Sequence, residues 1–231
     1  SLERFLDRSR ARVNRGLNPV PNRVLWQIFR CLARMVVGMA SPAADDGNFR
    51  SGNVQASLEQ PSIFDLGTQQ QIYHGDLANL QNCIFGDYDS GEHSLVPIIK
   101  AIDFGEGTDD VGTMKASLPI PATADTITQG NIFEIGRVMQ MLFEYFSTPS
   151  FQAFQVLRPN IDKDLYDLTK ECTDINHRKR PSAFQLLQRI QTNISNKKGP
   201  ENFPGKQFAD WESDERIREY MNEMLSLDTE I

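Results

Sequence analysis

Cysteine is scarce in this chain of 231 residues, which contains only Cys31, Cys83 and Cys172. The count is odd and no two of these residues form a C-x-x-C pair, so we expect neither a disulfide framework nor a thiolate metal site. Each thiol is best interpreted as a small, buried apolar side chain. A reducing compartment is the simplest setting, and we expect an intracellular protein, cytoplasmic or nuclear.

Long apolar runs are also missing. None approaches the roughly 18 residues that a membrane-spanning helix needs. The longest candidate, 24–40, is interrupted by Arg30 and Arg34 at helical spacing. The first residues, Ser1-Leu2-Glu3-Arg4, are charged and carry no apolar signal-peptide core. The sequence therefore predicts no membrane association.

The chain has no surplus of positive charge. It contains 24 Lys and Arg residues and 31 Asp and Glu residues, which gives a formal net charge of −7. General binders of nucleic acid or of anionic membranes need surplus Lys and Arg for their phosphate contacts, so we expect neither kind of partner. The acidic balance still allows a small anionic ligand held by a metal ion. Hydrophobic residues make up 39% of the chain, which is enough for a globular core.

Hydrophobic periodicity predicts a mainly helical α+β fold with one small β-hairpin. Helices are expected over 2–15, 22–40, 131–145 and 165–172, and another from Pro181-Ser182 onward, where Ser182 and Gln185 have the spacing of a capping box. Short apolar runs at 83–85 and 97–102 predict the two strands, while the polar segment 43–62 predicts a surface loop. Asn22 is the expected N-cap of its helix. His93 and His177 stand alone among polar residues, so we expect both at the surface.

The last part of the chain has a different pattern. Segment 193–205 contains two Pro and two Gly and predicts a linker. Over 214–227, five apolar residues fall on one helical stripe: Ile217, Tyr220, Met221, Met224 and Leu225. We therefore predict a domain over 1–198, followed by a linker and an amphipathic tail over 199–231. The 214–227 helix is expected to dock on a protein partner or on the domain itself.

Three polar clusters lie at the joints between apolar runs. His74-Gly75-Asp76-Leu77 follows the apolar pair Ile72-Tyr73, Asn82 opens the first predicted strand, and Asp103-Phe104-Gly105 closes the second. Two carboxylates and an amide at the ends of neighbouring strands can converge on one spot. Phosphoryl transfer needs such a set, because one carboxylate orients the attacking hydroxyl while another carboxylate and an amide oxygen hold Mg²⁺ against the phosphates.

These motifs, in this order, resemble the C-terminal lobe of a eukaryotic-type protein kinase, in particular the divergent kinase-like proteins of fungi. His74-Gly75-Asp76-Leu77 with Asn82 is similar to the catalytic-loop pattern H-R-D-L-x-x-x-N, and Asp103-Phe104-Gly105 to the metal-binding D-F-G. The run from Asn131 to Gly136 resembles the D-x-W-S-x-G opening of the family's central helix. Arg180-Pro181-Ser182 resembles the R-P-S signature of its closing helices. The resemblance covers residues 1–194.

The resemblance implies a role for each matching residue. Asp76 would be the catalytic base, with His74 bracing its loop. Asn82 and Asp103 would bind Mg²⁺, and the nucleotide would be ATP. The family's activity would be phosphoryl transfer from ATP to a protein Ser or Thr.

Four further roles follow from the same resemblance. Phe104 would pack into the core beneath the loop. Gly105 would permit the turn, because glycine tolerates backbone angles that other residues avoid. Arg180 would anchor the activation segment through an ion pair, and Asn131 takes the place of the Asp that opens the family's central helix.

The chain also departs from the family's pattern. Gly75 replaces the Arg that receives a phosphorylated activation loop, and Ala78 replaces the Lys that touches the transferred phosphate. Asn82 lies six residues after Asp76, where the family has five, so Asn79 or Gln81 could be the ligand instead.

The family's ATP-covering N-terminal lobe has no counterpart before Ser1. We therefore expect a transferase active in a full-length parent and weak or inactive as this chain. Two alternatives stay open. One is a pseudokinase scaffold that binds protein partners, suggested by Gly75 and Ala78. The other is a small-molecule phosphotransferase of the aminoglycoside- or choline-kinase type, whose H-G-D loop is similar to His74-Gly75-Asp76.

Overall fold

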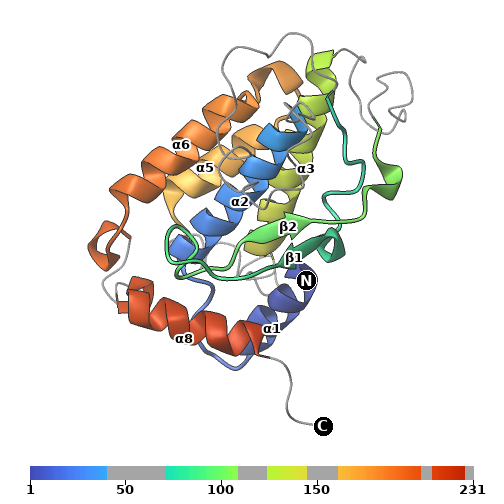
Figure 1. Ribbon diagram of the computed structural model, residues 1–231. Helices are drawn as coiled ribbons and strands as arrows, with labels where there is room; N and C mark the ends of the chain where they lie inside the picture. The colour runs from blue at the N-terminus through green and yellow to red at the C-terminus, as the bar shows by residue number, and fades with distance from the viewer. Residues whose placement is uncertain (41–70, 109–123, 145–160, 204–209, 227–231) are drawn as a thin grey trace.

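The computed structural model describes residues 1–40, 71–108, 124–144, 161–203 and 210–226, and within them the fold is mainly helical with one two-stranded antiparallel sheet (Figure 1). The helices are α1 (Leu2–Asn14), α2 (Asn22–Ala40), α3 (Ala124–Glu144), α5 (Lys163–Cys172), α6 (Ala183–Asn196) and α8 (Asp214–Leu225), and the strands are β1 (Cys83–Phe85) and β2 (Ile99–Ala101). The predicted α+β, mainly helical class is confirmed. The predicted loop 43–62 lies outside the described residues. No helix in the described part of the chain is both long and apolar enough to cross a membrane.

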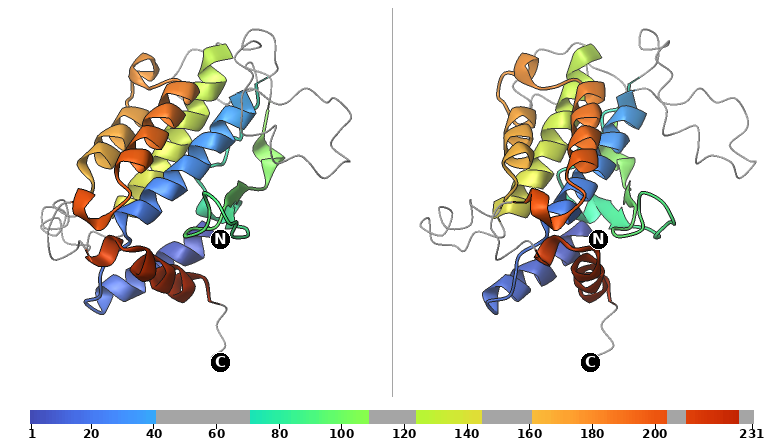
Figure 2. Two further views of the ribbon diagram at one scale, coloured as in Figure 1. Left: turned by 60° about the vertical axis from the view of Figure 1, so that its left-hand side comes forward. Right: turned by 90° about the vertical axis from the view of Figure 1, so that its left-hand side faces the viewer.

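Helix α2 is the centre of the core. It packs against α3 and α6, and α3 packs in turn against α5, so these four helices form one layered bundle (Figures 1 and 2). The apolar residues of α2 recur at steps of three and four and are fully buried, among them Ile28, Phe29 and Leu32. Asn22 is the first residue of the helix rather than its N-cap, since Pro21 O accepts the first turn's hydrogen bonds from the N–H groups of Val24 and Leu25.

Strand β1 pairs with β2 in antiparallel register, with Cys83 opposite Ala101, as the hairpin prediction requires. Two arginines of α2, which interrupt its apolar run, hold the long connection between these strands. The long connection folds back onto α2, where Glu92 forms ion pairs with Arg30 at 3.3 Å and Arg34 at 2.6 Å. This return buries His93, which is only 3% exposed. The expectation that His93 lies at the surface is therefore wrong.

Helix α3 begins earlier than its apolar pattern indicates. The pattern predicts 131–145, whereas the helix starts at Ala124. Its first two turns, 124–130, contain only one large apolar residue, Ile127, which weakens the periodic signal there. Ile127 already belongs to the core at 2% exposure. At the start of α6 the predicted capping box is confirmed, with Ser182 and Gln185 each accepting the other's backbone N–H.

The C-terminal helix packs on the chain itself. The views in Figures 1 and 2 place α8 beside α1, away from the bundle. Ile217, Tyr220, Met221 and Met224 are at most 3% exposed, and the Tyr220 ring meets Phe5 edge-on at 6.0 Å between centroids. The Tyr220 hydroxyl lies 2.6 Å from Ser9 Oγ. Because α1 covers this apolar face, the face cannot also serve the partner docking that we considered for it.

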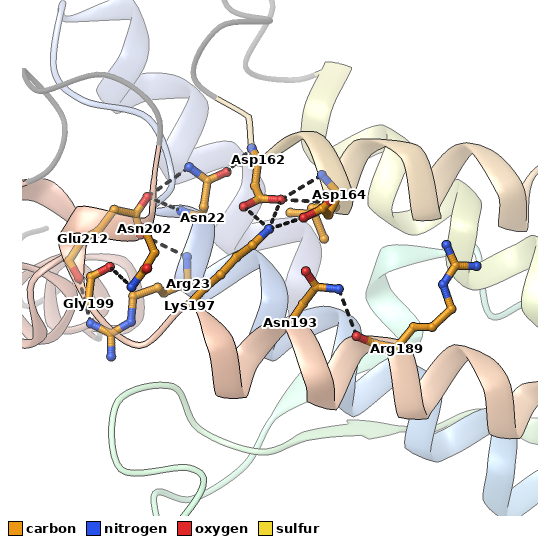
Figure 3. A network of polar contacts seen from close by, with 11 residues as sticks. Asn22, Arg23, Asp162, Asp164, Arg189, Asn193, Lys197, Gly199, Asn202 and Glu212 are labelled. Carbon is orange, nitrogen blue, oxygen red and sulfur yellow. Dashed lines mark hydrogen bonds and ion pairs between the residues drawn. The ribbon is translucent and has the colours of Figure 1, made fainter.

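A polar network joins the entry of α8 to the bundle (Figure 3). The buried Glu212 carboxylate accepts the backbone N–H of Asn22 at 2.7 Å and of Arg23 at 3.0 Å, so it caps the start of α2. Burial raises the pKa of Glu212. Asn22 Oδ1 in turn accepts the backbone N–H of Asp162, whose own carboxylate caps α5 and accepts Lys197 Nζ at 2.7 Å from α6. Three helices and the α8 entry therefore meet in one hydrogen-bonded cluster.

Candidate functional site

The His74–Asp76 loop is built around a fully buried histidine. His74 has 0% exposure, and its Nε2–H donates to the carbonyl of Ile102 at 3.1 Å. The backbone N–H of Asp76 points at His74 Nδ1 at 3.4 Å, so Nδ1 accepts and the ring is the neutral Nε2–H tautomer. His74 thus ties the segment carrying Asp76 to the end of β2, one residue before Asp103.

Two polar side chains of α3 hold the same loop from below. Asn131 is fully buried and bridges the segment, accepting the N–H of His74 at 3.1 Å and donating to the carbonyl of Ile72 at 2.8 Å. Glu134, three residues on, accepts the N–H of Leu77 at 2.9 Å and the hydroxyl of Tyr73 at 2.7 Å. The loop is therefore fixed at both ends by one turn of one helix.

Glu134 was missed by the sequence analysis. It is 7% exposed, and burial raises its pKa, with the Asp76 charge adding in the same direction. Burial next to this carboxylate also raises the pKa of the Tyr73 hydroxyl. A signal was present in the sequence, since Glu134 lies in the run Ile132-Phe133-Glu134-Ile135 with apolar residues on both sides, and a carboxylate on a buried helix face needs partners.

Asn82 connects the two segments that carry the candidate carboxylates. Its Nδ2 donates to Asp76 Oδ2 and to the Asp76 carbonyl, both at 3.0 Å. Its own carbonyl accepts the N–H of Ile102 at 2.9 Å, and Ile102 directly precedes Asp103. Asp76, Asn82 and Asp103 therefore lie on adjoining segments at one end of the sheet, linked by hydrogen bonds.

Compared with the kinase pattern, the loop has one more residue between Asp76 and Asn82, and a single 3-10 turn, Leu80–Asn82, accommodates it. Asn79 caps this turn by accepting the N–H of Gln81 at 3.2 Å, and its Nδ2 donates to Asp76 Oδ2 at 3.1 Å. Gln81 is exposed and Asn82 is buried. Of the three amides considered for metal binding, Asn82 is the one whose position is fixed by both Asp76 and the β2 segment.

Gly75 occupies a position that would be strained for any other residue. Its φ is +81°, in the left-handed region, and an added Cβ would lie 2.6 Å from the backbone oxygen of Glu106. The backbone of the D-F-G segment thus passes directly over the H-G-D loop. The Arg of the kinase pattern could not be accommodated at this position.

Two expectations for the D-F-G segment are wrong. The left-handed residue is Asp103 itself, with φ 61° and ψ 68°, whereas the φ of Gly105 lies outside that region. Asp103 Oδ1 accepts the N–H of Gly105 at 3.3 Å, which stabilises this conformation locally. Phe104 does not enter the core, since it is 48% exposed and rests on the His74 ring at 4.6 Å between centroids.

Arg180 contacts backbone carbonyls. Its Nε and Nη1 donate to Asp174 O and Gln129 O, both at 2.8 Å, and its guanidinium lies 4.7 Å from the centroid of the Phe133 ring. Arg180 thereby ties the turn after α5 to the first half of α3. Residues 109–123, most of the segment between Gly105 and Gly130 in which the anchored stretch was expected, lie outside the described residues.

The oxygen atoms of Asp103 and Asn82 are of the kind that bind a hard cation, whose remaining ligands could be phosphate oxygens. Asp103 is exposed, and Asn82 Oδ1 accepts no hydrogen bond from any described residue. Mg²⁺ prefers such oxygen ligands and is commonly held by one or two carboxylates together with substrate phosphates. The described residues contain no group of three or more His, Cys, Asp or Glu side chains able to hold a metal by themselves. Asp103 and Asn82 therefore carry oxygen atoms of the kind that would suit Mg²⁺.

No family model matches the chain, and no curated protein matches its sequence.

Proposed function

We propose that this chain carries the phosphoryl-transfer half of a protein-kinase-like enzyme that uses Mg²⁺ and ATP and acts on a protein Ser or Thr. The supporting observation is the hydrogen-bonded link Asp76–Asn82–Ile102, which sets the candidate base and the candidate metal ligands Asn82 and Asp103 on adjoining segments. Phosphoryl transfer depends almost entirely on positioning and on charge stabilisation, so a rigid arrangement of these groups is its main requirement.

Each residue has one task in this proposal. Asp76 accepts the proton of the attacking hydroxyl through its carboxylate, which Asn82 and Asn79 orient by donating to Oδ2. Asp103 and Asn82 would hold Mg²⁺, which would neutralise charge on the phosphates. His74, Asn131 and Glu134 keep the loop in shape. In this chain alone we expect little activity, since no residue with the role of a phosphate-positioning Lys is found in the loop, where Ala78 stands.

A transfer assay with labelled ATP on the full-length protein tests the proposal. Asp76→Asn and Asp103→Asn should each lower the rate by at least about a hundredfold, the scale expected when a general base or a charge-stabilising group is lost. Asp87→Asn is the matched control, because Asp87 is exposed on the strand connection. Equal activity in all three variants would contradict the assignment.

The small-molecule phosphotransferase is the second candidate, and Gly75 supports it. The left-handed φ and the close approach of the Glu106 backbone make the H-G-D form of the loop a structural requirement. A parallel assay with Ser/Thr peptides and with amino alcohols separates the candidates by which acceptor consumes ATP.

The pseudokinase alternative makes a different prediction. If the chain is a scaffold, calorimetry with ATP and Mg²⁺ should detect no binding, and Asp103→Asn should change nothing. Micromolar binding that Asp103→Asn abolishes would exclude it.

A further inference from the structure

The connection between the two strands, residues 86–98, is held on α2 by a single acidic residue. Figure 1 shows this connection leaving the sheet and turning back beside α2. Glu92 forms ion pairs with Arg30 at 3.3 Å and with Arg34 at 2.6 Å. Its backbone carbonyl also accepts Arg30 Nη2 at 2.9 Å. The contact therefore depends on the position of one residue in the connection.

Residues 89–94, which we call the clamp turn, form the part of the connection that carries Glu92. Asp89 Oδ1 accepts the N–H of Gly91 at 2.7 Å and that of His93 at 2.9 Å, and the N–H of Ser94 donates to Gly91 O at 3.3 Å. The clamp turn contains no helix or strand. A segment with only such local hydrogen bonds can open without unfolding the rest of the protein.

His93 places its ring inside the protein, directly after Glu92. The residue is 3% exposed, and its Nδ1 lies 3.3 Å from the carbonyl oxygen of Val96. Because a carbonyl only accepts, Nδ1 carries the proton and the ring is the neutral Nδ1–H tautomer. Nε2 is then an acceptor, and it is buried without a hydrogen-bond partner among the described residues.

The surroundings of this ring oppose a second proton. Protonation would turn Nε2 into a buried, charged donor that has no acceptor, which is costly in a protein interior. Burial lowers the pKa of His93, and the charges of Arg30 and Arg34 lower it further. Asp89 acts in the opposite direction, but it is exposed and its charge is screened by water.

The other charged groups near the clamp turn provide no partner for a protonated ring. Burial raises the pKa of the Cys31 thiol on α2, so this group is neutral. Glu92 is already paired with two arginines, and Asp214, across the cavity that Glu92 lines, is paired with Arg23 at 2.8 Å. The remaining charged residues that line this cavity are cations, Lys197 and Lys198 from the α6 side.

We propose that the clamp turn is a pH-sensitive latch: in mildly acidic solution His93 takes up a proton, its ring leaves the interior, and residues 89–94 separate from α2 while the helical bundle stays folded. Since His93 directly follows Glu92, a ring that swings out moves Glu92 away from the two arginines. The bundle does not depend on this turn, because α2 packs on α3 and α6 through buried apolar residues. Val96, at 1% exposure, keeps the next part of the connection in the core.

This inference is independent of the proposed phosphoryl transfer, since none of its residues belongs to that site. Amide hydrogen exchange of the whole chain measures the release. In the open turn His93 is in water, where a histidine has a pKa of about 6.5, so opening should be about thirtyfold more frequent at about pH 5 than at about pH 7.5. The protection factors of the His93 and Ser94 amides, corrected for the intrinsic pH dependence of exchange, should fall by this factor. The protection factor of Leu32, in the middle of α2, should fall much less.

Two variants separate His93 from other titrating groups. His93→Gln removes the ring and should abolish the pH dependence of protection in the clamp turn. His177→Gln is the matched control, because His177 lies in the turn after α5, and this variant should show the same fall as the wild type. An NMR titration of the His93 ring in the wild type needs no folded variant, and its midpoint should lie below about pH 6.5.

Three results would overturn the inference. The first is a titration midpoint of the His93 ring at or above about pH 6.5. The second is equal protection of the clamp turn at both pH values, or the same fall in His93→Gln as in the wild type. The third is an equal fall at Leu32, which would show that the whole bundle unfolds rather than the turn alone.

Discussion

Gly75 allows a quantitative test of how closely the D-F-G segment lies over the H-G-D loop. The perturbation is Gly75→Ala, and the matched control is Gly16→Ala. Both glycines have a left-handed backbone, with φ of +81° and +76°. They differ in surroundings, because a Cβ at Gly75 would lie 2.6 Å from Glu106 O, whereas a Cβ at Gly16 would meet nothing within 4 Å.

The expected magnitude has two parts. A left-handed conformation costs a non-glycine residue about 1–2 kcal/mol, and this part is common to both variants. Forcing an atom into a closely packed site costs about 1–3 kcal/mol more, and this part applies to Gly75 alone. We therefore expect Gly75→Ala to lower the free energy of unfolding by about 2 kcal/mol more than Gly16→Ala does. For a chain of this length that corresponds to a further drop in Tm of roughly 4–8 °C.

Urea unfolding followed by far-UV circular dichroism measures both variants under the same conditions. The slope of free energy against urea should stay unchanged, since neither substitution alters the surface that unfolding exposes. If the two variants lose the same stability, the close approach of Glu106 to Gly75 does not exist in solution, and the packing of the segment after Asp103 on the H-G-D loop loses its main steric support.

Two further predictions concern the network at the start of α2. Because burial raises the folded-state pKa of Glu212 above its usual value of 4.5, its contribution to stability is full at low pH and is lost as the pH rises through the raised value. Urea unfolding from pH 4 upward measures the difference in free energy of unfolding between the wild type and Glu212→Gln. This difference should shrink as the pH rises. A difference that stays constant with pH would contradict the burial of an ionisable carboxyl group. Lys197→Met removes the partner of the buried Asp162 carboxylate and should lower the free energy of unfolding by about 3 kcal/mol in the same assay. The control is Lys163→Met, which removes the exposed ion pair with Asp167 and should cause no measurable loss. Equal losses in the two variants would refute the network.

The helices with strong apolar stripes could be predicted almost to the residue. α1 was expected over 2–15 and spans 2–14, and α2 was expected and found over 22–40. Local signals suffice there, because proline-rich segments and apolar spacing define both ends. The start of α3 could not be predicted, since its first two turns carry no stripe. The prediction that His93 lies at the surface was wrong for another reason. Its burial depends on the ion pair between Glu92 and Arg30, about 60 residues apart in sequence, and local periodicity contains no information on such contacts.

In the candidate site, too, local sequence patterns predict some features, whereas long-range contacts decide others. That the segments carrying Asp76, Asn82 and Asp103 adjoin could be predicted, because each residue lies at the end of an apolar run and antiparallel strands bring their ends together. The supporting residue Glu134 could not, because its partners are a hydroxyl and a backbone N–H from a distant loop. The left-handed residue was assigned to Gly105 on residue type alone. The structure has it at Asp103, whose carboxylate accepts the N–H of Gly105 two residues on and so replaces the freedom that a glycine would have provided.

The loop's own hydrogen bonds explain why its remaining polar atoms are suited to a ligand. The N–H groups of His74, Asp76 and Leu77 donate to Asn131, His74 and Glu134 respectively, so the loop keeps its shape without any external partner. Within the described residues, Asn82 uses its amide nitrogen for Asp76 and leaves its amide oxygen unengaged. A loop that depended on a metal for its backbone bonds would collapse when the metal left. This loop instead keeps carboxylate and amide oxygens in place before a ligand binds, which is the preorganisation that the proposed phosphoryl transfer would require.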